Sequence, residues 1–158
     1  MNTEDIDRGE VLRYLGYGRH EADQAVMGLV EECIAQLLKE AQPRCLYREY
    51  PLILGPEGAV DGGCFQTVSM NLSRNLRDCG QIIVFAATLG TGADHLIQKY
   101  NKLQMSKAVI MQAAATAMIE EYCDQVCTGI REEYESGDRY LRPRFSPGYG
   151  DFPLDCQQ

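Results

Sequence analysis

The stretch Gln81-Ile82-Ile83-Val84-Phe85-Ala86-Ala87-Thr88, "QIIVFAAT", is a continuous apolar run with the length of a β-strand. Runs of this kind are typical of strands that are buried on both faces, so it predicts a central strand. The run continues into "LGTGAD", where two glycines precede Asp94, and residues 92–103 follow with the pattern of a helix. The sequence therefore predicts a strand, a glycine-rich turn and a helix in direct succession.

Three further segments carry helical periodicity. Apolar residues from Ala22 to Leu38 recur at i, i+3, i+4 and i+7, which predicts an amphipathic helix over Glu21–Ala41 that Pro43 stops. A shorter pattern predicts a first helix over Glu10–Tyr17. A long helix is predicted over Ser106–Tyr134, with Gly137 at its end.

For residues 46–79 the sequence predicts strands, turns and one short helix. Leu46–Leu54 is strand-like, and its Pro51 places it at a sheet edge. The turn-rich "GPEGAVDGG" follows, and Cys64–Met70 is expected to be the returning strand of a hairpin. Ser73 is expected to cap a short helix that runs through Cys79.

The order of these elements is mixed rather than strictly alternating, which predicts the α+β class. We expect a twisted antiparallel sheet covered by helices. A chain of 158 residues without a linker or an internal repeat fits a single domain over residues 1–158. A domain of this size buries roughly 70% of its unfolded surface, so no disulfide or metal is required for folding.

Composition narrows the classes of function. The net charge of −8 argues against a nucleic-acid partner, because phosphates need a basic surface. No run of about 18 apolar residues is present, so we expect no membrane-spanning segment. The start "MNTEDIDRGE" lacks the basic and apolar parts of a signal peptide, which predicts a cytoplasmic protein. The seven cysteines have no zinc-site spacing, so we interpret them as buried, reduced thiols, and we expect no metal.

Two segments are candidate sites with a structural alternative each. The turn from Thr88 to Asp94 can present backbone N–H groups to an anion, or it can be a tight strand-to-helix connection capped by Thr91 or Asp94. The acidic residues of the long helix, Glu120, Glu121 and Asp124, can meet a cationic group in a cleft, or they can form a solvated helix face.

The loop Arg142 to Pro153, "RPRFSPGYGDFP", is the third candidate. Pro143 and Pro147 fix φ at their own positions and push the preceding residues towards extended conformations. The guanidinium of Arg144 suits a carboxylate, Gly148 permits a close backbone approach, and Tyr149 offers a ring face and a hydroxyl. Together they predict a stiff ribbon that binds a ligand, the alternative being a tail that lies against the body.

The segment Arg144 to Tyr149 fits the pattern R-x-x-x-G-Y and thereby resembles the activation domain of cobalamin-dependent methionine synthase. "VFAATLGTGAD" and the later "AAATAMIEEYCD" are similar to small stand-alone proteins of that family, and the resemblance covers roughly residues 12–154. It implies a fold like that of the activation domain, with a C-terminal part shorter than in relatives. At the best-matching register Ala117 stands where the family has an acidic residue on the long helix, and Glu120 and Glu121 follow one turn later.

The resemblance implies that S-adenosylmethionine is the ligand. Arg144 would take its methionine carboxylate, Pro147, Gly148 and Tyr149 would form the adjacent wall, and Glu121 would supply an acidic contact. The implied function is that of an accessory module that supports reductive methylation of cob(II)alamin, at most one component of methionine synthase activity. Cobalamin would arrive only with a corrinoid-binding methionine synthase, and a flavodoxin-type protein would donate the electron.

Two alternatives belong to other classes of function. The chain can be a non-catalytic interaction partner of a corrinoid protein, with a degraded pocket. It can also be an unrelated small-molecule enzyme that uses the turn at Gly90–Asp94.

Overall fold

The computed structural model describes residues 2–18, 20 and 22–157. The chain divides into two compact units, each built from two stretches of sequence. The helical unit contains Met1–Cys45 and Ala87–Val126, and the sheet unit contains Leu46–Ala86 and Cys127–Gln158. Strand β1 (Arg44–Pro51), strand β5 (Gln81–Thr88) and helix α5 (Met105–Glu135) contribute residues to both. Helices and antiparallel strands occur together, so the predicted α+β class is confirmed.

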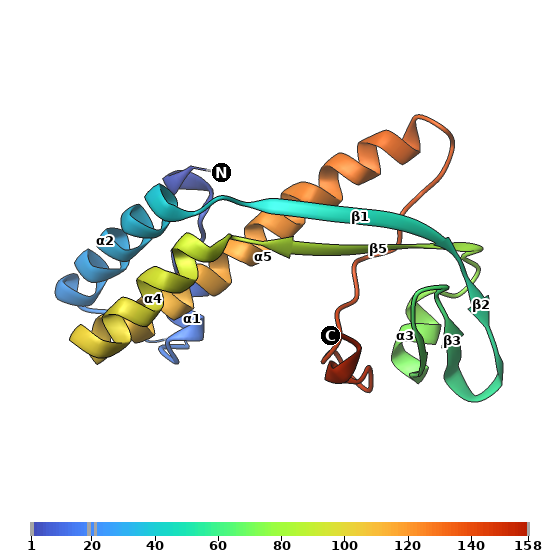
Figure 1. The fold of residues 1–158 in the computed structure, drawn as a ribbon, viewed down its shortest axis with the longest axis horizontal. Helices are drawn as coiled ribbons and strands as arrows, with labels where there is room; N and C mark the ends of the chain where they lie inside the picture. Colours follow the sequence, from blue (N-terminus) through green and yellow to red (C-terminus); the bar gives the residue numbers. More distant parts are fainter. Residues whose placement is uncertain (1, 19, 21, 158) are drawn as a thin grey trace. The chain divides into compact units, whose positions relative to one another are not determined.

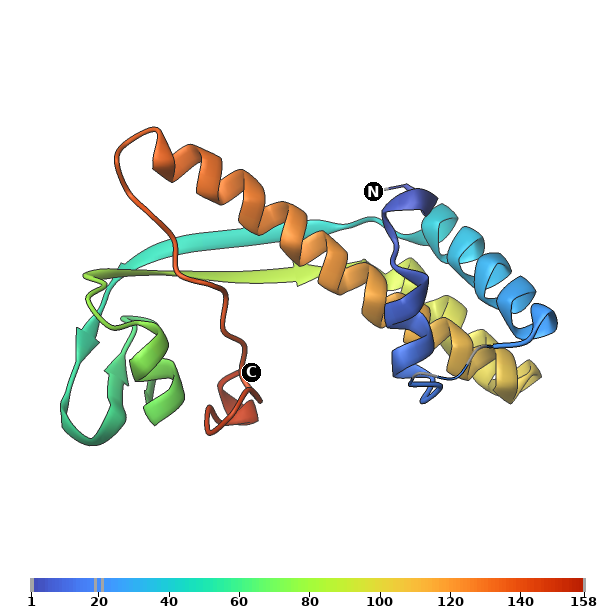
Figure 2. The ribbon, with the colours of Figure 1, turned by 180° about the vertical axis from the view of Figure 1, so that it is seen from behind.

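The helical unit gathers α1 (Arg8–Tyr14), α2 (Gln24–Glu40), α4 (Thr91–Leu103) and the first part of α5, after the short 3-10 turn Thr3–Asp5 (Figure 2). Two of these helices begin at aspartates whose carboxylates accept backbone hydrogen bonds. Asp7 accepts from the N–H of Gly9 at 2.7 Å, and Asp23 accepts from that of Val26 at 2.8 Å. These caps fix where the apolar faces of α1 and α2 start.

One apolar core holds the helical unit together. Helix α2 buries Val30, Cys33, Ile34 and Leu37, a spacing that places all four side chains on one face. From α5, Met111 and Met118 are completely buried in the same core. Full burial of an aliphatic side chain contributes about 1.5–3 kcal/mol, so these residues dominate the stability of the unit.

A buried lysine interrupts this core. Lys107 is 5% exposed, and its ammonium lies 2.7 Å from a carboxylate oxygen of Glu32 and 4.5 Å from the ring centroid of Tyr100. The Tyr100 hydroxyl in turn donates to Gln36 at 3.1 Å. The hydrogen bond to Glu32 raises the pKa of Lys107, so the amine stays charged and paired.

The turn that precedes α4 packs closely against the end of α2. Gly90 has a φ of 85°, and a Cβ atom at Gly92 would lie 2.4 Å from the carbonyl oxygen of Glu40. The N–H of Gln42 donates to the carbonyl of Leu89 at 2.7 Å. The end of α2 therefore lies directly against this turn, and the glycines are required by that contact. Helix α4 starts without a side-chain cap, so the prediction of Thr91 or Asp94 as its cap is wrong.

The strands form two small sheets. β1 and β5 lie side by side and run in opposite directions (Figure 1). β2 (Ile53–Leu54), β3 (Ala59–Asp61) and β4 (Gln66–Val68) form an antiparallel sheet in that order, with Leu54 opposite Val60 and Val60 opposite Thr67. A 3-10 turn, Pro56–Gly58, connects β2 to β3.

Helix α3 (Met70–Asn75) and the 3-10 turn Leu154–Gln157 complete the sheet unit. Ser69 caps α3, since its hydroxyl accepts from the N–H of Leu72 at 3.0 Å. The core of this unit is smaller than that of the helical unit. Its buried members are Leu52, Val60, Leu72, Leu76 and Phe152.

Most of the predicted elements exist, with corrections at particular residues. The predicted strand Leu46–Leu54 is divided into β1 and β2, and the returning strand, β4, pairs with β3 instead. The strand over Gln81–Thr88 has the predicted bounds, but none of its side chains is fully buried because it belongs to a two-stranded sheet. Ser73 lies inside α3, and Ser69 is its cap, because α3 starts and ends earlier than predicted. Ala59–Asp61 forms a strand within the segment expected to be a turn. Of the cysteines, Cys33 is buried, Cys64 is exposed and the other five are half-buried, so burial of all seven is wrong.

The helix predicted from Glu21 begins at Gln24, and Glu21 itself lies outside the described residues. The first helix ends at Tyr14, three residues before the predicted Tyr17. Over the described ranges, none of the helices combines the length and the apolar character that crossing a bilayer requires.

Candidate functional site

The loop after α5 folds back on itself in a compact turn. The N–H of Tyr149 donates to the carbonyl of Ser146 at 3.0 Å, and that of Phe152 donates to the carbonyl of Tyr149 at 3.0 Å. The N–H of Gly148 closes the turn by donating to the carbonyl of Phe152 at 2.8 Å. The rings of Phe145 and Tyr149 meet edge to face at 5.8 Å. The segment from 146 to 152 is therefore a built turn.

Asp151 fastens this turn to the start of α3. Its carboxylate accepts from the N–H groups of Met70 at 2.8 Å and Asn71 at 3.1 Å, and the hydroxyl of Ser69 donates to it as well. These hydrogen bonds, the one from Ser69 first, hold the pKa of Asp151 below its usual range. Gly150 has a φ of 56° and lies so close to Asn71 that a Cβ atom would clash with its side chain.

The first half of the loop is held by α3 and the turn after it. The side-chain amide of Asn75 donates to the carbonyl of Pro143 at 3.3 Å. The guanidinium of Arg142 donates to the carbonyl of Arg77 at 3.1 Å. The loop is thus anchored on both sides of Arg144, which fixes the backbone from which that side chain extends.

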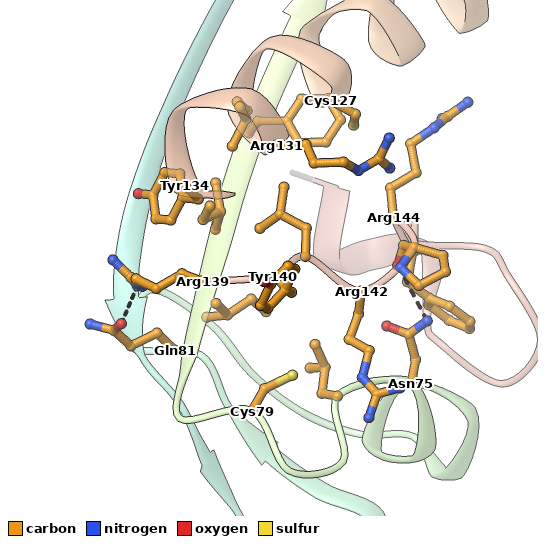
Figure 3. A pocket seen from close by; sticks show the side chains of 18 of the residues that line it. Asn75, Cys79, Gln81, Cys127, Arg131, Tyr134, Arg139, Tyr140, Arg142 and Arg144 are labelled. Carbon is orange, nitrogen blue, oxygen red and sulfur yellow. Dashed lines mark hydrogen bonds between the residues drawn. The ribbon is translucent and has the colours of Figure 1, made fainter. Parts of the chain in front are cut away.

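A cavity of about 350 Å³ lies beneath the loop, within the sheet unit (Figure 3). Its walls come from α3 and the following turn, from β5, from the end of α5 and from residues 139–145. Such a volume lies at the lower end of the range for small-molecule sites. Apolar groups form much of the wall, among them Leu72, Leu76, Ile82, Ile83, Phe85, Ile130, Leu141 and Phe145.

Four of the polar side chains of the cavity are arginines. Arg131 extends from α5, and Arg139, Arg142 and Arg144 extend from the loop. Among the described residues that line the cavity, Asp78 is the one acidic side chain. The cavity therefore has a positive electrostatic character, in contrast to the net charge of −8 of the whole chain.

Arg139 is held by its neighbours. Its guanidinium donates to the carboxylate of Glu49 and to the side-chain oxygen of Gln81, and it lies 4.6 Å from the ring centroid of Tyr134. The hydroxyl of Tyr134 donates to the same carboxylate at 2.8 Å. The hydrogen bond from Arg139, followed by that from Tyr134, lowers the pKa of Glu49. Arg139 therefore has a structural partner, and its charge is balanced at one edge of the cavity.

The structure separates the residues predicted from the sequence into three groups. Arg144 is half-buried and lines the cavity. Pro147, Gly148 and Tyr149 belong to the compact turn and do not line it, and Tyr149 is 46% exposed. Glu121 lies in the helical unit, where its carboxylate accepts from the side-chain amide of Gln125 at 3.0 Å.

Several cavity residues were not predicted. Cys127, Ile130, Arg131 and Tyr134 recur at i, i+3, i+4 and i+7 at the end of α5, so they lie on one helix face. That spacing is visible in the sequence, and it could have indicated a face directed towards another element. Asn75, Gln81 and Arg139 come from separate elements, and no local pattern connects them.

The arginines of the cavity suit the binding of an anion. Guanidinium groups are permanently charged donors that recognise carboxylates and phosphates. In the described part of the chain, no three His, Cys, Asp or Glu side chains converge on a possible metal site. Compared with protein-family models and with curated proteins, the chain matches none of them.

Proposed function

We propose that the chain is a S-adenosylmethionine-binding accessory module that supports reductive methylation of cob(II)alamin in a corrinoid-dependent methionine synthase. The observation that carries the proposal is the position of Arg144. This residue opens the R-x-x-x-G-Y pattern, and its side chain lies on the wall of a cavity of about 350 Å³. A guanidinium in that place is suited to the carboxylate of the methionine group.

The loop supports this role because its backbone is fixed before any ligand arrives. Asp151 attaches the far end to α3, and Asn75 holds the carbonyl of Pro143 next to Arg144. A binding group on a fixed backbone loses less conformational entropy when a ligand is bound. Phe85 and Phe145 add apolar wall to the cavity, which suits the nucleoside part of the ligand.

In the proposed reaction this chain positions the methyl donor. The corrinoid, carried by a partner methionine synthase, supplies the methyl acceptor, and a flavodoxin-type protein supplies the electron that reduces it. The methyl group leaves the sulfonium as a cation equivalent, and S-adenosylhomocysteine remains. Placement of two reactants can lower a barrier by several kcal/mol, which is the contribution expected of this chain. The proposed setting is the cytoplasm.

A second candidate function is that of a non-catalytic partner of a corrinoid protein. Gly148 and Tyr149 favour it, because both are exposed and lie outside the lining of the cavity. Exposed residues on a rigid turn are available to another protein. Under this alternative the chain binds the corrinoid protein equally well with and without S-adenosylmethionine, which a pull-down measures directly.

Calorimetry with S-adenosylmethionine tests the leading proposal. We expect the wild type to bind and Arg144→Ala to bind about tenfold or more weakly, since a charge-assisted hydrogen bond is worth roughly 1.5–3 kcal/mol. Arg74→Ala is the matched control, because Arg74 is an exposed arginine of α3 that does not line the cavity. Absence of binding by the wild type at millimolar ligand would refute the proposal.

A further inference from the structure

The basic residues of the sheet unit are all arginines. They are Arg48, Arg74, Arg77, Arg131, Arg139, Arg142 and Arg144. The lysines of the chain, at positions 39, 99, 102 and 107, all lie in the helical unit. Arginine presents a planar fork of donors that matches an oxyanion in two-point fashion, whereas lysine is a point charge. We infer that the cavity beneath the loop binds a phosphate ester, with Arg131 and Arg144 on either side of the phosphate.

The first observation in support of a phosphate ester is the balance of charge in the cavity. Four of these arginines line it, together with a single carboxylate, that of Asp78. Glu49 balances Arg139, and Arg142 directs one N–H to the carbonyl of Arg77. Arg131 makes no hydrogen bond or ion pair with any of the residues that the structure describes. Because a hydrogen bond to a carbonyl leaves the charge of Arg142 unbalanced, Arg131 and Arg142 together exceed the single negative charge of Asp78. A dianionic ligand balances positive charge better than a monoanionic one.

The second observation is the direction in which the arginine side chains extend. In Figure 3 the guanidinium groups of Arg131 and Arg144 extend to the same side of the cavity, from α5 and from the loop. Arg142 points the other way, towards α3, and Arg139 lies beside Gln81 at the start of β5. A tetrahedral phosphate has enough oxygen atoms to accept from two forks at once. A carboxylate carries one negative charge, so it balances the charge of only one of the two guanidinium groups.

The remaining wall favours an ester over free phosphate. The cavity volume of about 350 Å³ far exceeds what an inorganic phosphate ion occupies. Tyr140, Leu141 and Phe145 of the loop and Phe85 of β5 provide aromatic and aliphatic surface beside the arginines. Burial of apolar ligand surface against such groups contributes about 25 cal/mol per Å². An organic group attached to the phosphate would occupy this part of the cavity.

This ligand differs from the one in the proposed function. S-adenosylmethionine carries a sulfonium and an ammonium beside its carboxylate, whereas a phosphate ester is a dianion at neutral pH. The two ligands share Arg144, so they should compete. Arg131 is expected to matter more for the phosphate ester than for S-adenosylmethionine, because the second negative charge of the ester favours a second guanidinium.

Calorimetry with phenyl phosphate, inorganic phosphate and benzoate at pH 7.5 is the test. Phenyl phosphate and benzoate share the ring but differ in charge, and inorganic phosphate lacks the ring. We expect phenyl phosphate to bind most tightly, and we expect its affinity to fall as salt is added. Equal affinity for benzoate would overturn the preference for a dianion, and equal affinity for inorganic phosphate would overturn the ester.

Variants locate the site. Arg131→Gln should weaken phenyl phosphate about tenfold or more, Arg131→Lys should restore part of the loss, and Arg74→Gln should change nothing. Arg131 is exposed, and melting curves will show that each variant is folded. Phenyl phosphate binding that is unchanged in Arg131→Gln would overturn the inference. If the chain binds S-adenosylmethionine but not phenyl phosphate, this inference is wrong and the proposed function stands. If it binds phenyl phosphate but not S-adenosylmethionine, the proposed function is wrong and this inference stands.

Discussion

The carboxylate of Asp151 accepts a hydrogen bond from the backbone N–H of Met70 at 2.8 Å, although the two residues are 81 positions apart. Ser69 reinforces this link, because its hydroxyl donates to Asp151 while its oxygen caps α3 at Leu72. The loop therefore satisfies N–H groups that α3 cannot satisfy itself. A segment rich in proline and glycine is thus ordered by its hydrogen bonds to the start of one helix.

The charge of Asp151 makes this link dependent on pH. The pKa of Asp151 is lower in the folded protein than in the unfolded chain, mainly through the hydrogen bond from Ser69. Its contribution is therefore fully present above about pH 4 and is lost as the pH falls through the folded pKa. We expect wild type to melt at a higher temperature than Asp151→Asn at pH 7, and we expect the difference to shrink below about pH 4. Asp155→Asn, in the exposed turn that follows, is the control. A difference that widens on acidification would contradict this assignment.

Much of the fold could be predicted because its signals are local. The strand Gln81–Thr88 was predicted with its exact bounds from one apolar run, and α5 to within one residue at each end. Ala59–Asp61 was missed because glycines on both sides give it the composition of a turn, and its pairing partners are set by tertiary contacts. Burial of β5 was overestimated because the number of strands in a sheet is not a local property.

Prediction of the site depended on sequence proximity. Arg144, Gly148 and Tyr149 are neighbours in one short sequence pattern, but of these three only Arg144 lines the cavity. Arg131 and Tyr134 reach the same cavity from α5, and Gln81 reaches it from β5. Side chains that converge from separate elements leave no common spacing in the sequence. The helical spacing of Cys127, Ile130 and Tyr134 is a sequence signal that indicates one wall of the cavity.

Gly92 tests the contact between the start of α4 and the end of α2. A Cβ atom there would lie 2.4 Å from the carbonyl oxygen of Glu40, so Gly92→Ala must displace backbone. We expect a loss of about 1–3 kcal/mol in the free energy of unfolding, measured by urea denaturation. Gly28→Ala is the matched control, since Gly28 lies in α2 with open space around it and should gain about 0.5–1 kcal/mol. Similar effects of both variants would show that the close contact is absent.

Cys33 and Cys64 should differ in reactivity. Burial raises the pKa of the Cys33 thiol to about 11, whereas Cys64 is exposed. The thiolate is the reactive form, so a brief treatment with iodoacetamide at pH 8 should modify Cys64 and leave Cys33 intact. Peptide mass mapping measures both sites in one digest. Modification of Cys33 should appear only when urea unfolds the helical unit, and its rapid labelling in the native protein would contradict the burial.

Phe152 and Tyr149 test whether the loop is part of the core of the sheet unit. Phe152 is 6% exposed, and its ring centroid lies 5.9 Å from that of Phe65 and 6.3 Å from that of Phe145. Truncation of a buried phenylalanine leaves a cavity, so Phe152→Ala should lower the free energy of unfolding by about 3 kcal/mol or more in urea denaturation. Tyr149→Ala, three positions away and 46% exposed, should cost less than about 1 kcal/mol. If both variants unfold at the wild-type urea concentration, the loop contributes nothing to the core. That result would also contradict the fixed loop backbone that is proposed to position Arg144.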